Sequence, residues 1–170
     1  VVYSMFGVNT TAKYNGKTLS NLNVQATSSG VELINDIKME KGRLYNEAET
    51  NAGSPVVLLG HSIAEQLFGY EDPLGKEVRM FGRKLMVIGV LKKYGEMGNG
   101  ADDNAYVPAN FVRNFMNTGP QGMPCGVTIK PKKGVDAAEF EGVLRQKLRT
   151  YRGLKPNDID NFFLNKISSL

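Results

Sequence analysis

The residues that could do chemistry in this sequence are few. His61 is the only histidine and Cys125 the only cysteine among 170 residues. Cys125 lies ahead of a predicted strand, and we interpret it as a small buried hydrophobe. Ser62 follows His61 directly, but a hydrolase needs a nucleophile and a base that face each other, with a carboxylate that orients the base. A serine that begins a helix beside its histidine points elsewhere, so we interpret His61 as a polar residue at a junction between a strand and a helix. The sequence therefore predicts no catalytic residues.

Patterns for metal or phosphate binding are incomplete as well. Asp102 and Asp103 are consecutive, whereas the acids of a calcium loop alternate. Residues 15–18 read Asn-Gly-Lys-Thr, like the end of a phosphate-binding loop, but Thr11 stands where that loop requires glycine. The glycines within residues 95–100 follow a predicted strand without opening a helix. We therefore predict no metal site, no cofactor and no ATPase site in this chain.

The composition is that of an ordinary globular domain. Hydrophobic residues make up 41% and charged residues 22%, and the net charge of +4 comes from scattered cations. The densest basic patch, residues 130–133, suits a solvated loop better than a phosphate-binding surface, so we expect no nucleic acid. No apolar run approaches the roughly 20 residues of a membrane helix, and residues 1–5 lack signal-peptide features. Tryptophan is absent, which disfavours a polysaccharide- or peptidoglycan-binding module.

Residues 55–91 carry the clearest structural pattern of the chain. Ser62 and Glu65 have the spacing of a capping box, and Gly69 stands where a helix takes its left-handed end. The apolar residues between them fall on one face of the expected helix: Ile63, Ala64, Leu67 and Phe68. We expect, in order, a buried strand at Val56–Leu59, a helix ending at Gly69, and a hairpin with arms at Glu77–Phe81 and Leu85–Leu91 and a turn near Gly82 and Arg83.

The rest of the chain alternates between extended and helical patterns. Asn15 and Gly16 form the strongest hairpin signal, and Ser29 with Glu32 predicts a second capping box. We expect strands at 1–8, 19–27, 37–41, 105–108, 126–130 and 158–165, and helices at 29–34, 111–116 and 135–152. Residues 46–54 and 95–104 are interpreted as surface loops, and both are candidate contact surfaces.

A specific pattern in the central stretch resembles a known family. The letters V-x-L-G-H-S-x-A-x-x-L-F at 57–68, then D-P-L-G-K and V-I-G-V-L, preceded by Gly42 and Arg43, are similar to the extracytoplasmic core domain of MacB-type ABC transporter permeases. The resemblance covers about Ser29 to Leu164. It implies an α+β fold, with a porter-like subdomain at 1–40 and 104–170 that contains a β-α-β unit. A smaller Sabre-like α/β subdomain, at 41–103, is inserted into it.

The same resemblance implies a function. Such a domain is not an enzyme, and it couples ATP-driven motion of membrane helices to extracytoplasmic partners or to substrate export. The implied location is periplasmic, in an inner-membrane protein whose flanking membrane helices adjoin this chain. The implied partners are a second permease subunit, the ATP-binding domain of the same transporter and a periplasmic adaptor protein, with a weak dimer or none for the isolated domain. Lipoprotein-release permeases and regulators of cell-wall hydrolases share this layout, and the sequence does not separate them.

One alternative belongs to a different class, a soluble α+β ligand-binding domain or enzyme with a pocket between its subdomains. A deep pocket lined by Asp102, Asp103 and Arg43 would favour it. The apolar cluster of Phe111, Phe115, Met116 and Met123 is interpreted as core packing rather than an exposed partner-binding surface.

Overall fold

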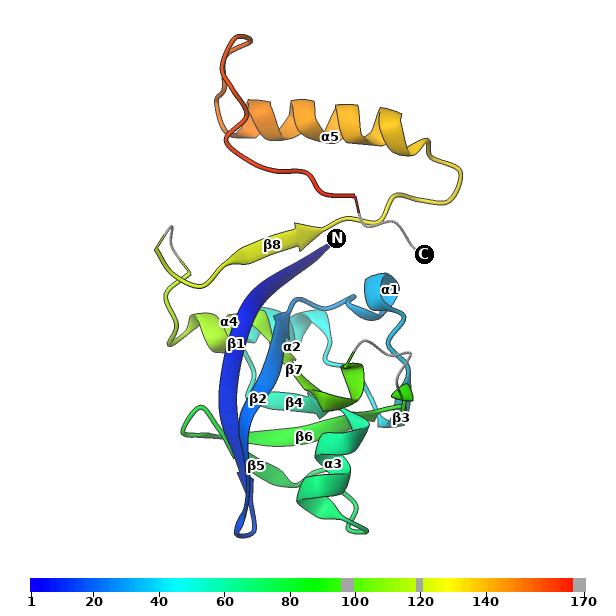
Figure 1. Ribbon diagram of the computed structural model, residues 1–170, viewed down its shortest axis with the longest axis vertical. Coiled ribbons are helices and arrows are strands. Elements are labelled where there is room, and N and C mark those ends of the chain that lie inside the picture. Colours follow the sequence, from blue (N-terminus) through cyan, green and yellow to red (C-terminus); the bar gives the residue numbers. More distant parts are fainter. Residues whose placement is uncertain (96–99, 119–120, 167–170) are drawn as a thin grey trace. The chain divides into compact units, whose positions relative to one another are not determined.

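The computed structural model describes residues 1–95, 100–118 and 121–166 (Figure 1). The chain divides into two compact units, Val1–Ile129 and Lys130–Leu170, and each is described by itself. Helices and strands are mixed along the first unit, which confirms the predicted α+β class. The division into residues 1–40 with 104–170 and an inserted 41–103 stays a prediction.

The first unit contains most of the secondary structure. Its elements are β1 (Val2–Tyr14), β2 (Lys17–Thr27), α1 (Glu32–Asn35), β3 (Met39–Gly42), α2 (Glu47–Ala52), β4 (Val56–Leu59), α3 (His61–Phe68), β5 (Glu77–Met80), β6 (Arg83–Leu91), η2 (Ala101–Asp103), β7 (Asn104–Pro108), α4 (Ala109–Arg113) and β8 (Cys125–Thr128). The second unit contains α5 (Ala137–Tyr151).

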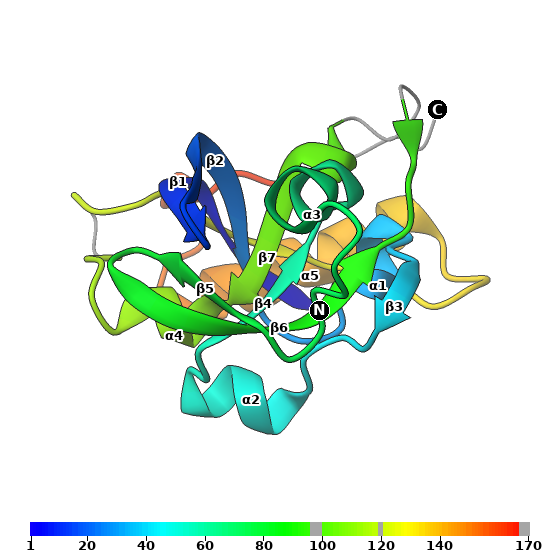
Figure 2. The ribbon, with the colours of Figure 1, turned by 90° about the horizontal axis from the view of Figure 1, so that it is seen from below.

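Six of these strands pair in a ring. Going around it, β1 pairs with β2, β2 with β7, β7 with β4, β4 with β6, β6 with β5, and β5 with β1 again (Figure 2). The β2–β7 and β4–β6 pairs are parallel and the others antiparallel. The β1–β5 contact consists of one register pair, Lys13 with Arg79. The β1–β5 pairing is therefore the shortest in the ring, and we call it the closing seam.

Two tight turns build the hairpins of the ring. Asn15 and Gly16 connect β1 to β2 with φ of 44° and 80°, as the Asn-Gly signal predicts. Phe81 and Gly82 connect β5 to β6, with φ of 55° and 68°. The predicted second turn was one residue too late, because Met80 pairs with Arg83 and leaves only the two residues between them in the loop.

The main core fills the space between the strands and α3. Val57, Leu85 and Val87 are fully buried in it. The predicted apolar face of α3 is confirmed, since Ile63, Ala64, Leu67 and Phe68 are all buried. Gly69 ends α3 with a positive φ and donates its N–H to Glu65, also as expected.

Both capping boxes expected from serines are wrong. Helix α3 begins two residues earlier than predicted, with Gly60 rather than Ser62 as its N-cap and no capping side chain. A Cβ at residue 60 would lie 2.3 Å from the carbonyl oxygen of Asp102, so the backbone packs too closely there for any other residue. Helix α1 begins after Val31, which is buried in the core, and it too has no capping side chain.

The predicted surface loop at 46–54 is a helix. Asn46 accepts a hydrogen bond from the Glu49 N–H at 2.9 Å, and the Glu49 carboxylate accepts from the Asn46 N–H at 3.0 Å. This reciprocal capping box begins α2, and Gly53 ends it in the left-handed conformation. Arg43 holds the same carboxylate at 2.7 and 2.8 Å, so this segment is firmly attached to the chain after β3.

In the second unit the predicted helix is confirmed and the predicted strand is not. Asp136 caps α5, and Glu141 and Arg145 form an ion pair at 3.3 Å. Residues 158–165 form no strand, so the predicted β-α-β unit lacks its second strand. The Arg149 guanidinium donates to the carbonyl oxygens of Lys155, Pro156 and Asp158, which fixes the chain in a turn just before this irregular segment. No helix within residues 1–95, 100–118 and 121–166 is long and apolar enough to cross a membrane.

Candidate functional site

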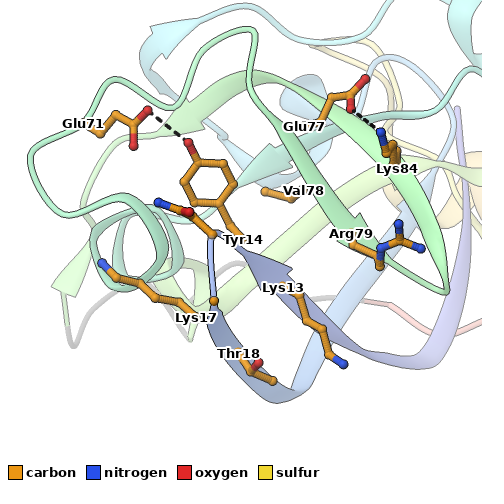
Figure 3. A pocket seen from close by; sticks show the side chains of 11 residues that line it. Lys13, Tyr14, Lys17, Thr18, Glu71, Glu77, Val78, Arg79 and Lys84 are labelled. Atoms are coloured by element: carbon orange, nitrogen blue, oxygen red, sulfur yellow. Dashed lines mark hydrogen bonds and ion pairs between the residues drawn. The ribbon is translucent and has the colours of Figure 1, made fainter.

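A hollow of about 610 Å³ lies beside the closing seam of the ring (Figure 3). We call it the seam groove. The end of the β1–β2 hairpin, residues 13–18, forms one wall, and residues 77–79 of β5 with Lys84 of β6 form the other. Glu71, from the turn after α3, completes the lining.

The groove exists because β1 ends before it has paired along β5. After Lys13 pairs with Arg79, the chain turns at Asn15 and Gly16 into β2. Within the described residues, no strand therefore lies along the outer edge of β5 at Glu77. The groove is thus a gap in a closed sheet, with a strand edge in its wall.

One acid of the groove is already engaged by neighbours. Glu71 accepts a hydrogen bond from the Tyr14 hydroxyl at 3.0 Å and forms an ion pair with Lys76 at 3.1 Å. The Lys76 contact, followed by the Tyr14 bond, lowers the pKa of Glu71, and the same contact raises the pKa of Lys76. Loss of hydration and then the bond to Glu71 raise the pKa of Tyr14. Glu71 is therefore a carboxylate that fixes the tyrosine ring at the groove.

The remaining charges of the groove are mostly positive. Glu77 forms an ion pair with Lys84 at 3.2 Å (Figure 3). In the described part of the chain, Lys13, Lys17 and Arg79 form no ion pair, although Lys17 also contributes to the low pKa of Glu71. The groove therefore presents three cations whose charge is not neutralised by direct contact with an acid.

A second hollow of about 360 Å³ lies near α4 and the β5–β6 turn. Phe111 and Phe115 line it together with Arg83, whose guanidinium lies 4.9 Å from the centre of the Phe115 ring. Phe111 is only 5% exposed and belongs to the main core, against which Phe115, Met116 and Met123 pack. This confirms the core-packing interpretation of the aromatic cluster.

His61 and Asp102, the residues considered for catalysis and for metal binding, each have structural partners. His61 Nδ1 lies 2.7 Å from the Glu40 carboxylate, so the histidine connects the start of α3 to β3. Asp102 is buried and accepts backbone hydrogen bonds from Tyr94 and Gly95 at 2.8 and 2.7 Å. Asp103 is exposed.

A pocket lined by Arg43, Asp102 and Asp103 would have favoured an enzyme, and neither of the two hollows described above is that pocket. Arg43 is engaged by Glu49, and neither hollow is lined by Arg43, Asp102 or Asp103. Within the described residues, no three acid, histidine or cysteine side chains gather as metal ligands. Of the predicted contact surface at 95–104, residues 96–99 lie outside the described residues.

Cys125 is exposed, not the small buried hydrophobe that its sequence context predicted. It lies on β8, a strand added outside the ring to β1, and its sulfur accepts a hydrogen bond from the Tyr3 hydroxyl at 2.9 Å. Burial, and then this bond, raise the pKa of Tyr3 to about 12. The strand pattern alone did not distinguish the two faces of β8.

The seam groove could not be predicted from the sequence. The signal that was present is the pair Lys13 and Lys17 on either side of the Asn-Gly turn, which places two cations at one hairpin end. Arg79 and Glu71 come from segments more than 50 residues further along the chain. Only the closure of the ring brings these side chains to one place.

Comparison with known proteins gives a consistent result. A family model described as MacB-like periplasmic core domain matches residues 1–147. The macrolide export ATP-binding/permease protein MacB of Neisseria gonorrhoeae is 27% identical over 137 residues, which cover 81% of this chain and 20% of that protein. An uncharacterized ABC transporter permease of Bacillus subtilis, YknZ, is 30% identical over 95 residues, covering 56% of this chain and 24% of the permease.

Solved structures show the same likeness. The periplasmic region of MacB from Actinobacillus actinomycetemcomitans superposes with a TM-score of 0.75 at 25% identity, over 91% of this chain and 68% of that one. The extracellular domain of the noncanonic ABC-type transporter YknZ from Gram-positive bacteria gives 0.68 at 23% identity, over 91% and 76%, and supports the fold alone. The chain spans about a fifth of the length of the MacB sequence that it matches.

Proposed function

We propose, from the premise that this chain belongs to the MacB-like periplasmic core domain family, that it transmits ATP-driven motion of membrane helices to the extracytoplasmic side of an ABC transporter. The transported substrate is proposed to be a macrolide or a molecule of similar kind, because several of the relatives are named as macrolide export proteins. The surrounding protein is proposed to lie in the inner membrane, with this chain in the periplasm.

The closed ring of strands is the observation that carries this proposal. A part that transmits motion must move as a body, without absorbing the displacement internally. The inward side chains of the central strands β4 and β6 are fully buried, among them Val57, Leu59 and Val87. Such close-packed interiors resist deformation. The first unit is therefore suited to pass on a push or rotation applied at one of its ends.

We propose that the chain is not an enzyme and that ATP is hydrolysed by another part of the transporter. The titratable side chains that sequence analysis considered have structural partners: His61 with Glu40, Arg43 with Glu49, and Asp102 with backbone N–H groups. None of these pairs a nucleophile with a base. The proposed partners are the ATP-binding domain of the same transporter, a second permease subunit and a periplasmic adaptor protein.

The experiment uses the full transporter that contains this chain, reconstituted in vesicles. Val87→Asp disrupts the buried face of β6, while Met86→Asp changes the adjacent residue, whose side chain is 48% exposed. We expect Val87→Asp to abolish ATP-driven macrolide transport while basal ATP hydrolysis persists, and Met86→Asp to leave both unchanged. Transport that survives Val87→Asp in a transporter whose domain is shown by proteolysis to be unfolded would refute the proposal.

A further inference from the structure

We propose that the seam groove binds an extended acidic segment of a partner protein. This inference rests on the proposed function, because the contact belongs to a partner of the transporter. It adds to the proposed function the site of that contact and the chemistry of the partner segment. Three properties of the groove carry the argument: its surplus of cations, the strand edge in its wall, and a tyrosine held in a fixed position.

The charge of the groove selects for an anion. Lys13, Lys17 and Arg79 line it without forming an ion pair in the described chain. The two acids in the lining are each engaged by a lysine, Glu71 by Lys76 and Glu77 by Lys84. A ligand that enters the groove therefore meets a net positive field, which attracts carboxylates and repels basic segments.

The backbone of β5 favours a peptide over other anions. Glu77 is in register with Met86 of β6, but the Met86 N–H donates to Pro55 at 2.9 Å, away from β5. In an antiparallel ladder, both residues of such a pair turn their N–H and C=O groups away from each other. The N–H and C=O of Glu77 therefore face the groove, on the side where Arg79 pairs with Lys13.

The open edge of β5 is one residue long, and the N–H and C=O of Glu77 match the C=O and N–H of one residue of an extended peptide. Such a peptide can add at this strand edge while its alternate side chains reach the walls. Acidic side chains at alternate positions would then meet the cations of the groove. The Tyr14 ring, held by Glu71 at 3.0 Å, contributes an apolar contact at the hairpin end.

The test measures binding of a labelled ten-residue peptide of alternating glutamate and threonine to this chain by fluorescence anisotropy. The groove variant combines Lys13→Glu, Lys17→Glu and Arg79→Glu. The matched control combines Lys132→Glu, Lys133→Glu and Lys147→Glu, which are exposed and change the net charge equally. We expect the groove variant to weaken binding at least about tenfold and the control by less than about twofold, because three direct ion pairs are reversed only in the first.

Four further measurements make the result decisive: a lysine peptide, amide chemical shifts, melting temperature and vesicle binding. A peptide with lysine in place of glutamate should not bind. Amide chemical shifts should change at Glu77 and Val78 on adding the acidic peptide, with the groove variant retaining the parent melting temperature. Equal weakening in both variants, or no binding by the parent, would overturn the proposal. So would groove-dependent binding of phosphatidylglycerol vesicles without binding of the peptide, since the ligand would then be lipid.

Failure of this inference is distinguishable from failure of the proposed function. The peptide assay reports only on the groove, whereas transport by the Val87→Asp variant reports on the domain as a whole. If Val87→Asp abolishes transport but the parent chain does not bind the peptide, the proposed function stands and the acidic partner segment is refuted.

Discussion

Val87→Asp is the substitution whose effect can be worked out most fully. Val87 is fully buried in the main core, and its strand β6 is paired with both β4 and β5. Removing the valine side chain from the core forfeits about 2 kcal/mol of burial. Placing an unpaired carboxylate there, charged or protonated, costs several kcal/mol more. The sum is comparable with the whole stability of a small domain, about 5–15 kcal/mol.

The assay is thermal unfolding of the isolated chain, followed by circular dichroism. We expect Val87→Asp to show no cooperative transition above room temperature. The matched control is Met86→Asp, on the adjacent residue with a 48% exposed side chain, and we expect its melting temperature to fall by no more than a few degrees. A Val87→Asp transition within about 2 °C of the parent would show that β6 is not a buried central strand.

Three other predictions concern local packing, pH and assembly. Gly60→Ala should destabilise the fold, because the new Cβ would lie 2.3 Å from the Asp102 carbonyl oxygen. Gly142→Ala, in α5, should stabilise that helix slightly, because the new Cβ would meet open space. Similar melting temperatures for the two variants would contradict this prediction. The hydrogen bond from Arg43 lowers the pKa of Glu49 to about 2. The ionised Glu49 therefore stabilises the fold fully above about pH 5, and this stabilisation is lost as the pH falls toward 2. The difference in melting temperature between the parent and Glu49→Gln should shrink over that pH range, and a constant difference would refute the coupling. The isolated chain should sediment as a monomer or weak dimer in ultracentrifugation, against which a tight dimer at low micromolar concentration would count.

Local signals predicted most elements of the first unit. The Asn-Gly pair at 15 and 16 specified a tight turn because both residues tolerate positive φ. The apolar run Val56–Leu59 and the face of α3 were recognised because burial imposes a period on the sequence that each element displays by itself. The capping box at Asn46 and Glu49 carries a local signal of the same kind, so the helix interpreted as a loop was also within reach of the sequence.

Other predictions failed where residues outside the element intervene. Residues 158–165 have the apolar content of a strand, but Arg149 binds the carbonyl groups of Lys155, Pro156 and Asp158 and fixes a turn where that segment begins. The cap expected at Ser62 was replaced by Gly60, since the approach of the Asp102 backbone sets where α3 begins. Neither interaction can be recognised from the hydrophobic periodicity of the element that it alters.

The family motif at 57–68 and the hairpins were therefore determined by the sequence itself, because residue type and short-range spacing suffice for them. The closure of the ring was decided only by the tertiary structure. β2 pairs in parallel with β7, about 80 residues further along, and no local pattern encodes that partner. The seam groove follows from the same closure: Lys13 and Arg79 meet because β1 and β5 are brought together around a shared core, and the groove opens because β1 turns away immediately afterwards.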